Sequence, residues 1–165
     1  MIGKLHDAIA QVAFGIACAA LLVLLGSYLV EVVARYAFNA PTRWSSDLVS
    51  YSLCVCVAFA LPIVTRDGGH VAITSFIEKA SLERQAVLHR TIALIGALTL
   101  IGAALVFAVI AKSQASQGIE TVAAFAIPKW WLTALLTYGL ADAGFHLVRM
   151  TFAATVRTAA HEMDV

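Results

Sequence analysis

The feature that most constrains this chain is a set of apolar runs long enough to cross a membrane. The first, 8–33, is interrupted only by Gln11, Ser27 and Glu31. A helix needs ~20 apolar residues to cross a hydrocarbon core about 30 Å thick, so this run predicts a membrane-spanning helix. Because the run is too long for the apolar part of a signal peptide and leads directly into a charged corner, we expect a retained span.

The composition indicates the same class of protein along the whole chain. The 165 residues are 61% hydrophobic and only 13% charged, whereas about a quarter of the residues of a soluble domain are charged. We therefore predict an all-α integral membrane protein with a single domain, 1–165. Four spans are expected, at about 8–36, 47–65, 87–111 and 129–151. A net charge of +1 excludes a strongly basic nucleic-acid-binding protein, so we expect no nucleic acid among its partners.

The stretch between the second and third spans, 71–80, is too short and too charged to cross a membrane. Ile73, Phe76 and Ile77 recur at helical spacing, and Glu78 falls on the other face. This pattern predicts a short amphipathic helix at the membrane surface, in contact with lipid or with a partner chain.

The third helix is expected to be longer than the membrane is thick. It is predicted to begin near Leu82 and to continue to about Ser113, so its first turns should extend into water. Gly96, Gly102 and Ala104 are small residues in this helix, and they indicate close packing against a neighbouring helix.

Lysine and arginine are divided unequally between the two sides of the membrane. The side that would hold both termini and the connection after the second span carries seven: Lys4, Arg66, Lys79, Arg84, Arg90, Arg149 and Arg157. The other side carries the remaining four of the eleven: Arg35, Arg43, Lys112 and Lys129. Because basic residues concentrate on the cytoplasmic side, we predict that both termini are cytoplasmic.

The three cysteines, Cys18, Cys54 and Cys56, all lie in apolar runs. An odd number of cysteines in such segments argues against a disulfide framework. Cys54 and Cys56 are two apart, so a helix would point them in nearly opposite directions, which is a poor arrangement for binding a metal. We expect no metal site and no cofactor in this chain.

The corner after the first span contains residues with clear local preferences. Glu31 and Arg35 are four apart, so a helix places them on one face as an ion pair. Asn39 and Pro41 are expected to end that helix, because asparagine tolerates the left-handed conformation and proline keeps the preceding residue out of the helical region.

The start of the next helix is also marked. Trp44 is typical of the membrane interface. Ser45 or Ser46 is expected to cap the second span, and Asp47 in its first turn complements the helix dipole. Pro128 occupies the corresponding place before the fourth span, where its missing N–H costs nothing.

Three stretches match the pattern of one protein family. They are R-Y-A-F-N-A-P-T-R-W at 35–44, R-D-G-G-H-V at 66–71 and E-T-V-A-A-F-A-I-P-K-W-W at 120–131. In this order, at the corners between spans, they resemble the small membrane subunit, of the DctQ type, of the tripartite ATP-independent periplasmic (TRAP) transporters. The residues that we take from this pattern as candidates for contact with partner subunits are Arg35, Tyr36, Phe38, Asn39, Pro41, Trp44, Asp47, Gly69, His70, Glu120, Thr121, Pro128 and Trp131.

The resemblance implies a transport subunit without enzymatic activity in the inner membrane of a bacterium. In that family a periplasmic binding protein delivers a small organic acid to a large multi-span subunit, which holds the substrate and sodium sites. This chain is then expected to pair with the large subunit, to contact the binding protein and lipid, and to bind no substrate itself. It departs from the family where two adjacent acids commonly follow the tryptophan, because Ser46 and Asp47 stand there.

Four ionisable residues are predicted within the spans or at their ends: Glu31, Asp142, His146 and Arg149. Charged groups inside a membrane are costly, so they usually face protein or water. His146 and Arg149 follow Asp142 at spacings of four and seven, which places all three on one helix face. We favour a polar seam that fixes helix packing over a proton or ion relay.

Two other functions fit parts of this pattern. A small four-helix multidrug exporter needs an acid in the middle of its first span, but Glu31 lies near the outer end of its helix and is followed by Arg35. A haem-binding membrane anchor could use His89 and His146, which both lie toward the cytoplasmic side. The sequence offers no second histidine pair, and Asp142 lies one turn from His146.

Overall fold

The computed structural model describes residues 2–66 and 82–163, with side-chain surroundings described for 10–65, 87–88 and 90–151. It contains four helices in these ranges: α1 (Ile2–Ala37), α2 (Ser45–Arg66), α4 (Leu82–Gln117) and α5 (Lys129–Met163). The prediction of an all-helical chain is confirmed. The predicted surface helix at 71–80, together with Gly69 and His70, lies outside the described residues.

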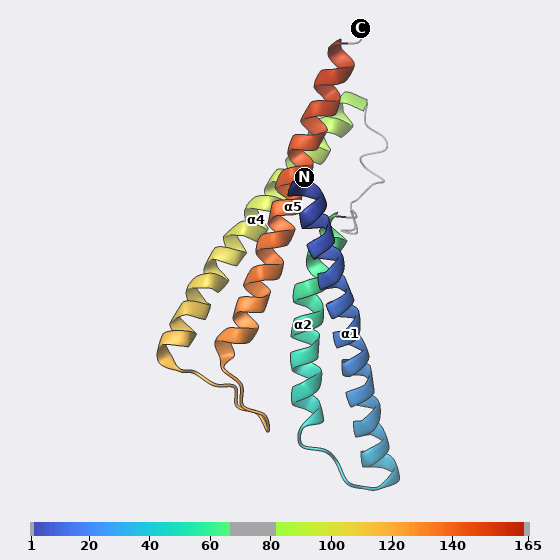
Figure 1. Ribbon diagram of the computed structural model, residues 1–165, viewed down its shortest axis with the longest axis vertical. Helices are drawn as coiled ribbons and strands as arrows, with labels where there is room; N and C mark the ends of the chain where they lie inside the picture. The colour runs from blue at the N-terminus through green and yellow to red at the C-terminus, as the bar shows by residue number, and fades with distance from the viewer. Residues whose placement is uncertain (1, 67–81, 164–165) are drawn as a thin grey trace.

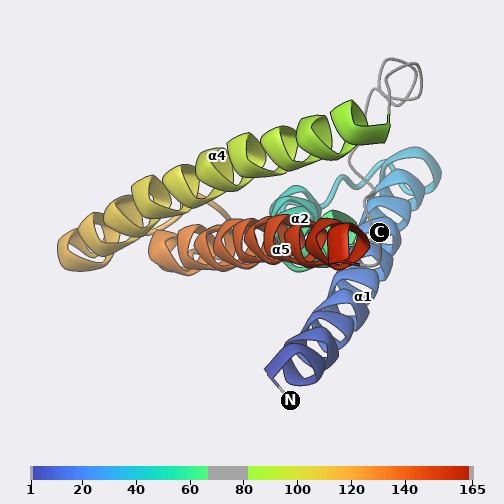
Figure 2. The ribbon, with the colours of Figure 1, turned by 90° about the horizontal axis from the view of Figure 1, so that it is seen from above.

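The helices form an open row rather than a closed four-helix bundle. α1 packs on α2, α2 packs on α5, and α5 packs on α4. Figures 1 and 2 show two antiparallel pairs, α1–α2 and α4–α5, that meet through α2 and α5. The α1–α2 connection and the α4–α5 connection lie at the same end of the molecule, here called the loop end, and the far end of α5 lies opposite (Figure 1).

Small residues allow α1 and α2 to pack closely. The buried face of α1 carries Ala10, Ala13, Ala17 and Ser27. Their spacings of three, four and ten residues keep them on one side of the helix. Small side chains permit two helix backbones to approach, which is the usual means of helix association in a membrane.

Glycines serve the same purpose where α5 crosses its neighbours. A side chain at Gly139 would collide with the backbone of Ala58 in α2. On the other side, a Cβ at Gly144 would lie 2.8 Å from Cγ1 of Ile101 in α4. α5 is therefore the helix that joins the two pairs, and it depends on glycine to do so.

Within the described ranges, three helices are long and apolar enough to cross a membrane. They contain the candidate spans Ala10–Ala37, Ser45–Thr65 and Arg90–Gln117, which correspond to the first three predicted spans. α5, which contains the predicted fourth span at 129–151, is not among them. Its sequence mixes apolar residues with Tyr138, Asp142 and His146, which lower its hydropathy.

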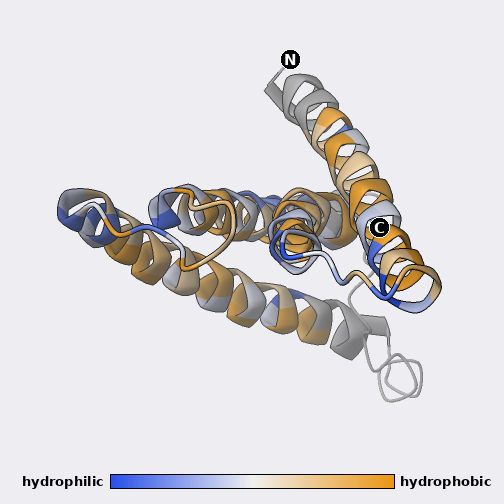
Figure 3. Ribbon diagram, turned by 90° about the horizontal axis from the view of Figure 1, so that it is seen from below, coloured by the Kyte–Doolittle hydropathy of each residue, from blue (hydrophilic) through white to orange (hydrophobic). Residues whose placement is uncertain are grey.

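The helices expose large apolar side chains along most of their length, and Figure 3 shows that hydrophobic residues predominate along the described helices. Leu22 in α1 and Leu98 in α4 are each more than two-thirds exposed. In a water-soluble protein such surfaces would drive aggregation, so lipid or other membrane proteins must cover them.

Candidate functional site

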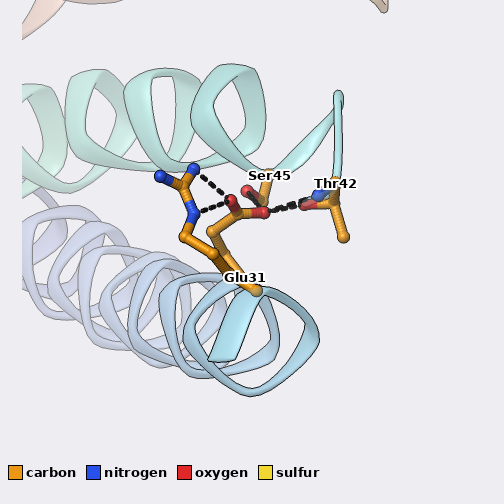
Figure 4. A network of polar contacts seen from close by, with 4 residues as sticks. Glu31, Thr42 and Ser45 are labelled. Atoms are coloured by element: carbon orange, nitrogen blue, oxygen red, sulfur yellow. Dashed lines mark hydrogen bonds and ion pairs between the residues drawn. The ribbon is translucent and has the colours of Figure 1, made fainter. Parts of the chain in front are cut away.

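The α1–α2 corner is organised by one carboxylate, that of Glu31 (Figure 4). Arg35 donates to its Oε1 from Nε at 3.0 Å and from Nη2 at 2.5 Å. The ion pair predicted from the spacing of four residues is therefore confirmed. Both donors reach the same oxygen, which leaves the other oxygen of Glu31 free to accept from other groups.

The other oxygen of Glu31 binds the connection itself. Its Oε2 accepts hydrogen bonds from the backbone N–H of Thr42 at 2.9 Å, from the Thr42 hydroxyl, and from the Ser45 hydroxyl at 2.9 Å. Ser45 or Ser46 was expected to cap α2; the Ser45 hydroxyl points back to Glu31 of α1. The N–H of Leu48 bonds to the carbonyl of Trp44 at 3.1 Å, the first backbone hydrogen bond of α2.

α1 ends as its sequence predicts. Asn39 has a φ of 50°, in the left-handed region, and the N–H of Ala40 bonds to the carbonyl of Ala34 at 3.0 Å. This is the pattern of a helix closed by a left-handed residue just beyond its last turn. Pro41 follows and prevents the helix from continuing.

Two aromatic residues of this corner point away from the network. Tyr36 is 83% exposed and Phe38 is 74% exposed. They contribute no hydrogen bond or ring contact within the described part of the chain. Both aromatic side chains are therefore available to another molecule.

A second carboxylate, that of Asp47, binds the α4–α5 connection. Its Oδ2 accepts a hydrogen bond from the N–H of Ala124 at 2.6 Å. One turn further along α2, the hydroxyl of Tyr51 lies 2.7 Å from Oγ1 of Thr121 and donates to the carbonyl of Phe125 at 3.0 Å. We call these residues of α2, Asp47 and Tyr51, the α2 clamp.

The clamp changes the interpretation of Asp47. Its place in the family pattern led us to expect a contact with a partner, whereas its carboxylate holds a segment of its own chain. Tyr51 was not singled out from the sequence. The available signal was its spacing of four from Asp47, which puts both side chains on one face of α2.

The α4–α5 connection also has internal structure. Thr121 and Ile127 face each other, with the N–H of Thr121 bonding to the Ile127 carbonyl at 2.9 Å and the N–H of Ile127 to Oγ1 of Thr121 at 3.0 Å. The N–H of Lys129 bonds to the Ile119 carbonyl at 2.9 Å. Gly118, with a φ of 61°, ends α4. The connection is thus a compact loop held at its base and on one side.

The remaining candidates at the loop end lie around this loop. Glu120 forms an isolated bridge with Pro128, and its side chain is exposed. Pro128 directly precedes α5, and its carbonyl accepts from the N–H of Trp131 at 3.1 Å. Trp131 is half exposed and meets Trp130 edge to face, with ring centroids 6.0 Å apart.

Comparison with known families decides what kind of component this is. The family model for the DctQ component of tripartite ATP-independent periplasmic transporters matches residues 24–158. The chain belongs to the DctQ family. A search among curated proteins gives no match.

The DctQ match covers both corners of the loop end and the whole of α2 and α4. The family is one of transporter components rather than enzymes, and it belongs to a tripartite system with other components. No cluster of three or more potential metal ligands occurs in the part of this DctQ chain that the structure describes.

The polar residues that were predicted to lie in the fourth span differ in their partners and in their exposure. The Tyr138 hydroxyl donates to Oδ2 of Asp142 at 3.3 Å, and the Tyr138 ring packs against Phe59 of α2 at 5.6 Å between centroids. His146 is only 2% exposed, whereas Arg149 is exposed. Tyr138, one turn before Asp142, is a partner that the sequence analysis missed.

Proposed function

We propose that this chain is the small membrane subunit of a TRAP transporter and that it pairs with the large membrane subunit as a rigid scaffold. The transporter imports a small organic acid delivered by a periplasmic binding protein. Substrate binding and sodium coupling belong to the large subunit, so this chain performs no chemistry. The family match supports the membership, and the geometry of the loop end supports the scaffold role.

The scaffold role rests on one observation: both acids of the loop end hold connections of their own chain. Glu31 binds the α1–α2 connection through Thr42 and Ser45. Asp47 binds the α4–α5 loop through the N–H of Ala124. Hydrogen bonds to a charged acceptor are strong, and they hold both connections in place. A surface held in this way is ready to receive a partner without first being ordered.

The geometry of Glu31 argues against the alternative function, a small multidrug exporter. Such a protein must exchange protons or substrate at a membrane-embedded carboxylate that is open to the transport path. Here the Glu31 carboxylate is occupied by Arg35, Thr42 and Ser45. A scaffold uses a carboxylate in this way, but a transport site does not.

α5 is proposed as the fourth span. It packs lengthwise between α2 and α4, two helices that meet the length and hydropathy of a span. Ala143 and His146 are almost completely buried among them. A helix enclosed by two spans tolerates polar residues because protein rather than lipid surrounds them.

The proposed orientation places both termini in the cytoplasm and the loop end on the periplasmic side of the inner membrane. The charge bias of seven basic residues against four supports it. Fusion of a cytoplasm-active reporter to either terminus should give signal, and fusion of a periplasm-active reporter should give none. The opposite pattern at both termini would invert the arrangement.

The experiment that tests the function is co-purification from native membranes. A tagged chain, solubilised in a mild detergent, is expected to bring with it one multi-span protein in fixed proportion. Transport by the pair should require sodium and a binding protein loaded with an organic acid. Recovery of the chain only as a self-assembly that transports by itself would reject the scaffold role and favour the exporter.

A further inference from the structure

The α4–α5 loop lies beside the first turns of α2, not beyond them. Three successive levels of α2 are contacted: Asp47 by the N–H of Ala124, Tyr51 by the carbonyl of Phe125, and Cys54 by the carbonyl of Leu132, 3.8 Å from the thiol sulfur. Leu132 is already in α5, so the loop ends before α5 reaches the level of Cys54. In Figure 1 the loop accordingly lies alongside the lower end of α2.

This position has a consequence for the depth of the loop in the membrane. The candidate span of α2 has 21 residues, which is about 32 Å of helix at 1.5 Å per residue and matches a hydrocarbon core of about 30 Å. Because this described span just matches the thickness of the core, the first turns of α2 lie at the boundary of the core on the loop-end side. The α4–α5 loop, held against those turns, is therefore recessed to the same depth.

The exposed side of the recessed loop suits neither water nor lipid. Val122 is fully exposed and Phe125 is 59% exposed. The run V-A-A-F-A-I at 122–127 has no polar side chain. Loops that face water are, in contrast, rich in polar residues. At the base of the loop, the side chains of Glu120 and Lys129 are exposed. At the boundary of the hydrocarbon core, an apolar loop with non-helical backbone and charged groups at its base is best accommodated by a protein surface around it.

We propose that the outward side of this loop, formed by Glu120, Val122, Phe125 and Lys129, is covered by the large membrane subunit. The partner surface should present an apolar depression for Val122 and Phe125, bordered by groups that complement one acidic and one basic side chain. This assignment rests on the proposed function and adds to it the segment that docks. The α2 clamp presents the loop, and the loop makes the contact.

Photo-crosslinking from position 125 tests the assignment in the intact membrane. The variant Phe125→p-benzoyl-phenylalanine carries an aromatic photo-crosslinker in place of the phenylalanine ring. Tyr51 bonds only to the backbone carbonyl of residue 125, so this variant keeps the hydrogen bond to the clamp. Irradiation of cells that express the whole transporter should join this chain to the large subunit. Products that contain only lipid, a second copy of this chain or the binding protein would each overturn the proposal.

A matched pair of substitutions gives an independent measure. Phe125→Ala should lower recovery of the large subunit with the tagged chain by at least about tenfold, which corresponds to about 1.4 kcal/mol. Phe125→Leu, which keeps an apolar side chain, should stay close to the wild type. Equal recovery with Phe125→Ala and the wild type would remove the loop from the interface.

The two proposals fail in different ways. If the unaltered chain brings down no large subunit, the proposed function is wrong and the loop has no such partner. If the unaltered chain brings it down but position 125 neither crosslinks to it nor affects recovery, only the loop assignment is wrong.

Discussion

At the scale of single residues, two acids determine the shape of the loop end. Glu31 and Asp47 each accept a hydrogen bond from a backbone N–H of a connection, that of Thr42 and that of Ala124 respectively. A charged acceptor makes a shorter and stronger bond to such a group than a neutral one does. These two acids are thus placed where the backbone leaves the helices and needs partners.

Replacing Glu31 tests this directly. Glu31→Gln removes the charge that pairs with Arg35 and places an amide donor toward either Arg35 or Thr42. The apparent melting temperature of the purified chain in detergent should fall by about 3 °C, and more if the corner opens completely. Glu120→Gln is the control, because Glu120 makes no side-chain hydrogen bond or ion pair within the described residues, and it should leave the melting temperature unchanged. Equal melting temperatures for both variants would contradict the role of Glu31.

Tyr51 supplies a second test, at the α4–α5 loop. Tyr51→Phe keeps the ring and removes the hydroxyl that bonds to Thr121 and Phe125. Hydrogen exchange of the amides at 124–127 should become about fivefold faster, the factor for a net hydrogen-bond contribution of about 1 kcal/mol. Tyr36→Phe alters an exposed hydroxyl and should leave those amides unchanged. Unaltered exchange in the Tyr51 variant would show that the loop does not depend on the clamp.

Sequence reasoning at this scale succeeds where partners are close along the chain. Glu31 and Arg35 are four apart, and the left-handed conformation of Asn39 is a local preference, so both were predicted and both are confirmed. The bonds of Tyr51 to Thr121 and of Asp47 to Ala124 join residues 70 and 77 positions apart. Spacing carries no information about such contacts, because they arise only after the helices have packed.

At the scale of helices, close approach of α2 and α5 is the contact that unites the two pairs. Gly139 lies directly against the backbone of Ala58, and Phe59 packs beside Tyr138. A glycine at such a crossing permits backbone contact that any side chain would prevent. The helix–helix interface is therefore sensitive to a single added methyl group.

Gly139→Ala is expected to destabilise this crossing by about 1–3 kcal/mol, the usual cost of an overpacked interface. Thermal unfolding in detergent should show the loss. Gly102→Ala is the matched control, because a Cβ at Gly102 in α4 meets nothing within 4 Å. If the two alanine variants unfold at the same temperature, the Gly139 contact is not the one that holds α2 and α5 together.

The same comparison shows what a sequence reveals about helix packing. Small residues in the third span predicted a close neighbour, and Gly96 and Ala104 do lie at the packed face of α4, whereas Gly102 is exposed. Gly139 and Gly144, which make the tightest crossings, were not singled out. In a chain with so many small residues, composition indicates close packing but does not say which helix faces which.

At the scale of the whole molecule, the open row explains why so much apolar surface remains. α1 and α4 stand at its two ends, and each packs extensively on one neighbour only. The lengths of the apolar runs predicted the four long helices that the structure describes, but nothing in them predicts a row instead of a closed bundle. That choice depends on which faces carry small residues, and on partners and lipid that cover the rest.

The row also predicts that the chain can be divided between its two pairs. Residues 1–73 and 74–165, expressed together as separate chains, should associate, because α2 and α5 carry the contact between the pairs. Affinity capture of one half from a detergent extract should recover the other.

A bulkier change at the crossing distinguishes the contribution of the helices from that of the loop. Gly139→Leu should abolish recovery of the second half, since a long side chain cannot fit against the backbone of Ala58. Tyr51→Phe should reduce recovery only slightly, because it leaves the helix crossing intact. The opposite result would be separation of the halves by Tyr51→Phe but not by Gly139→Leu. In that case the contact between the α4–α5 loop and α2, rather than the α2–α5 crossing, would hold the two helix pairs together.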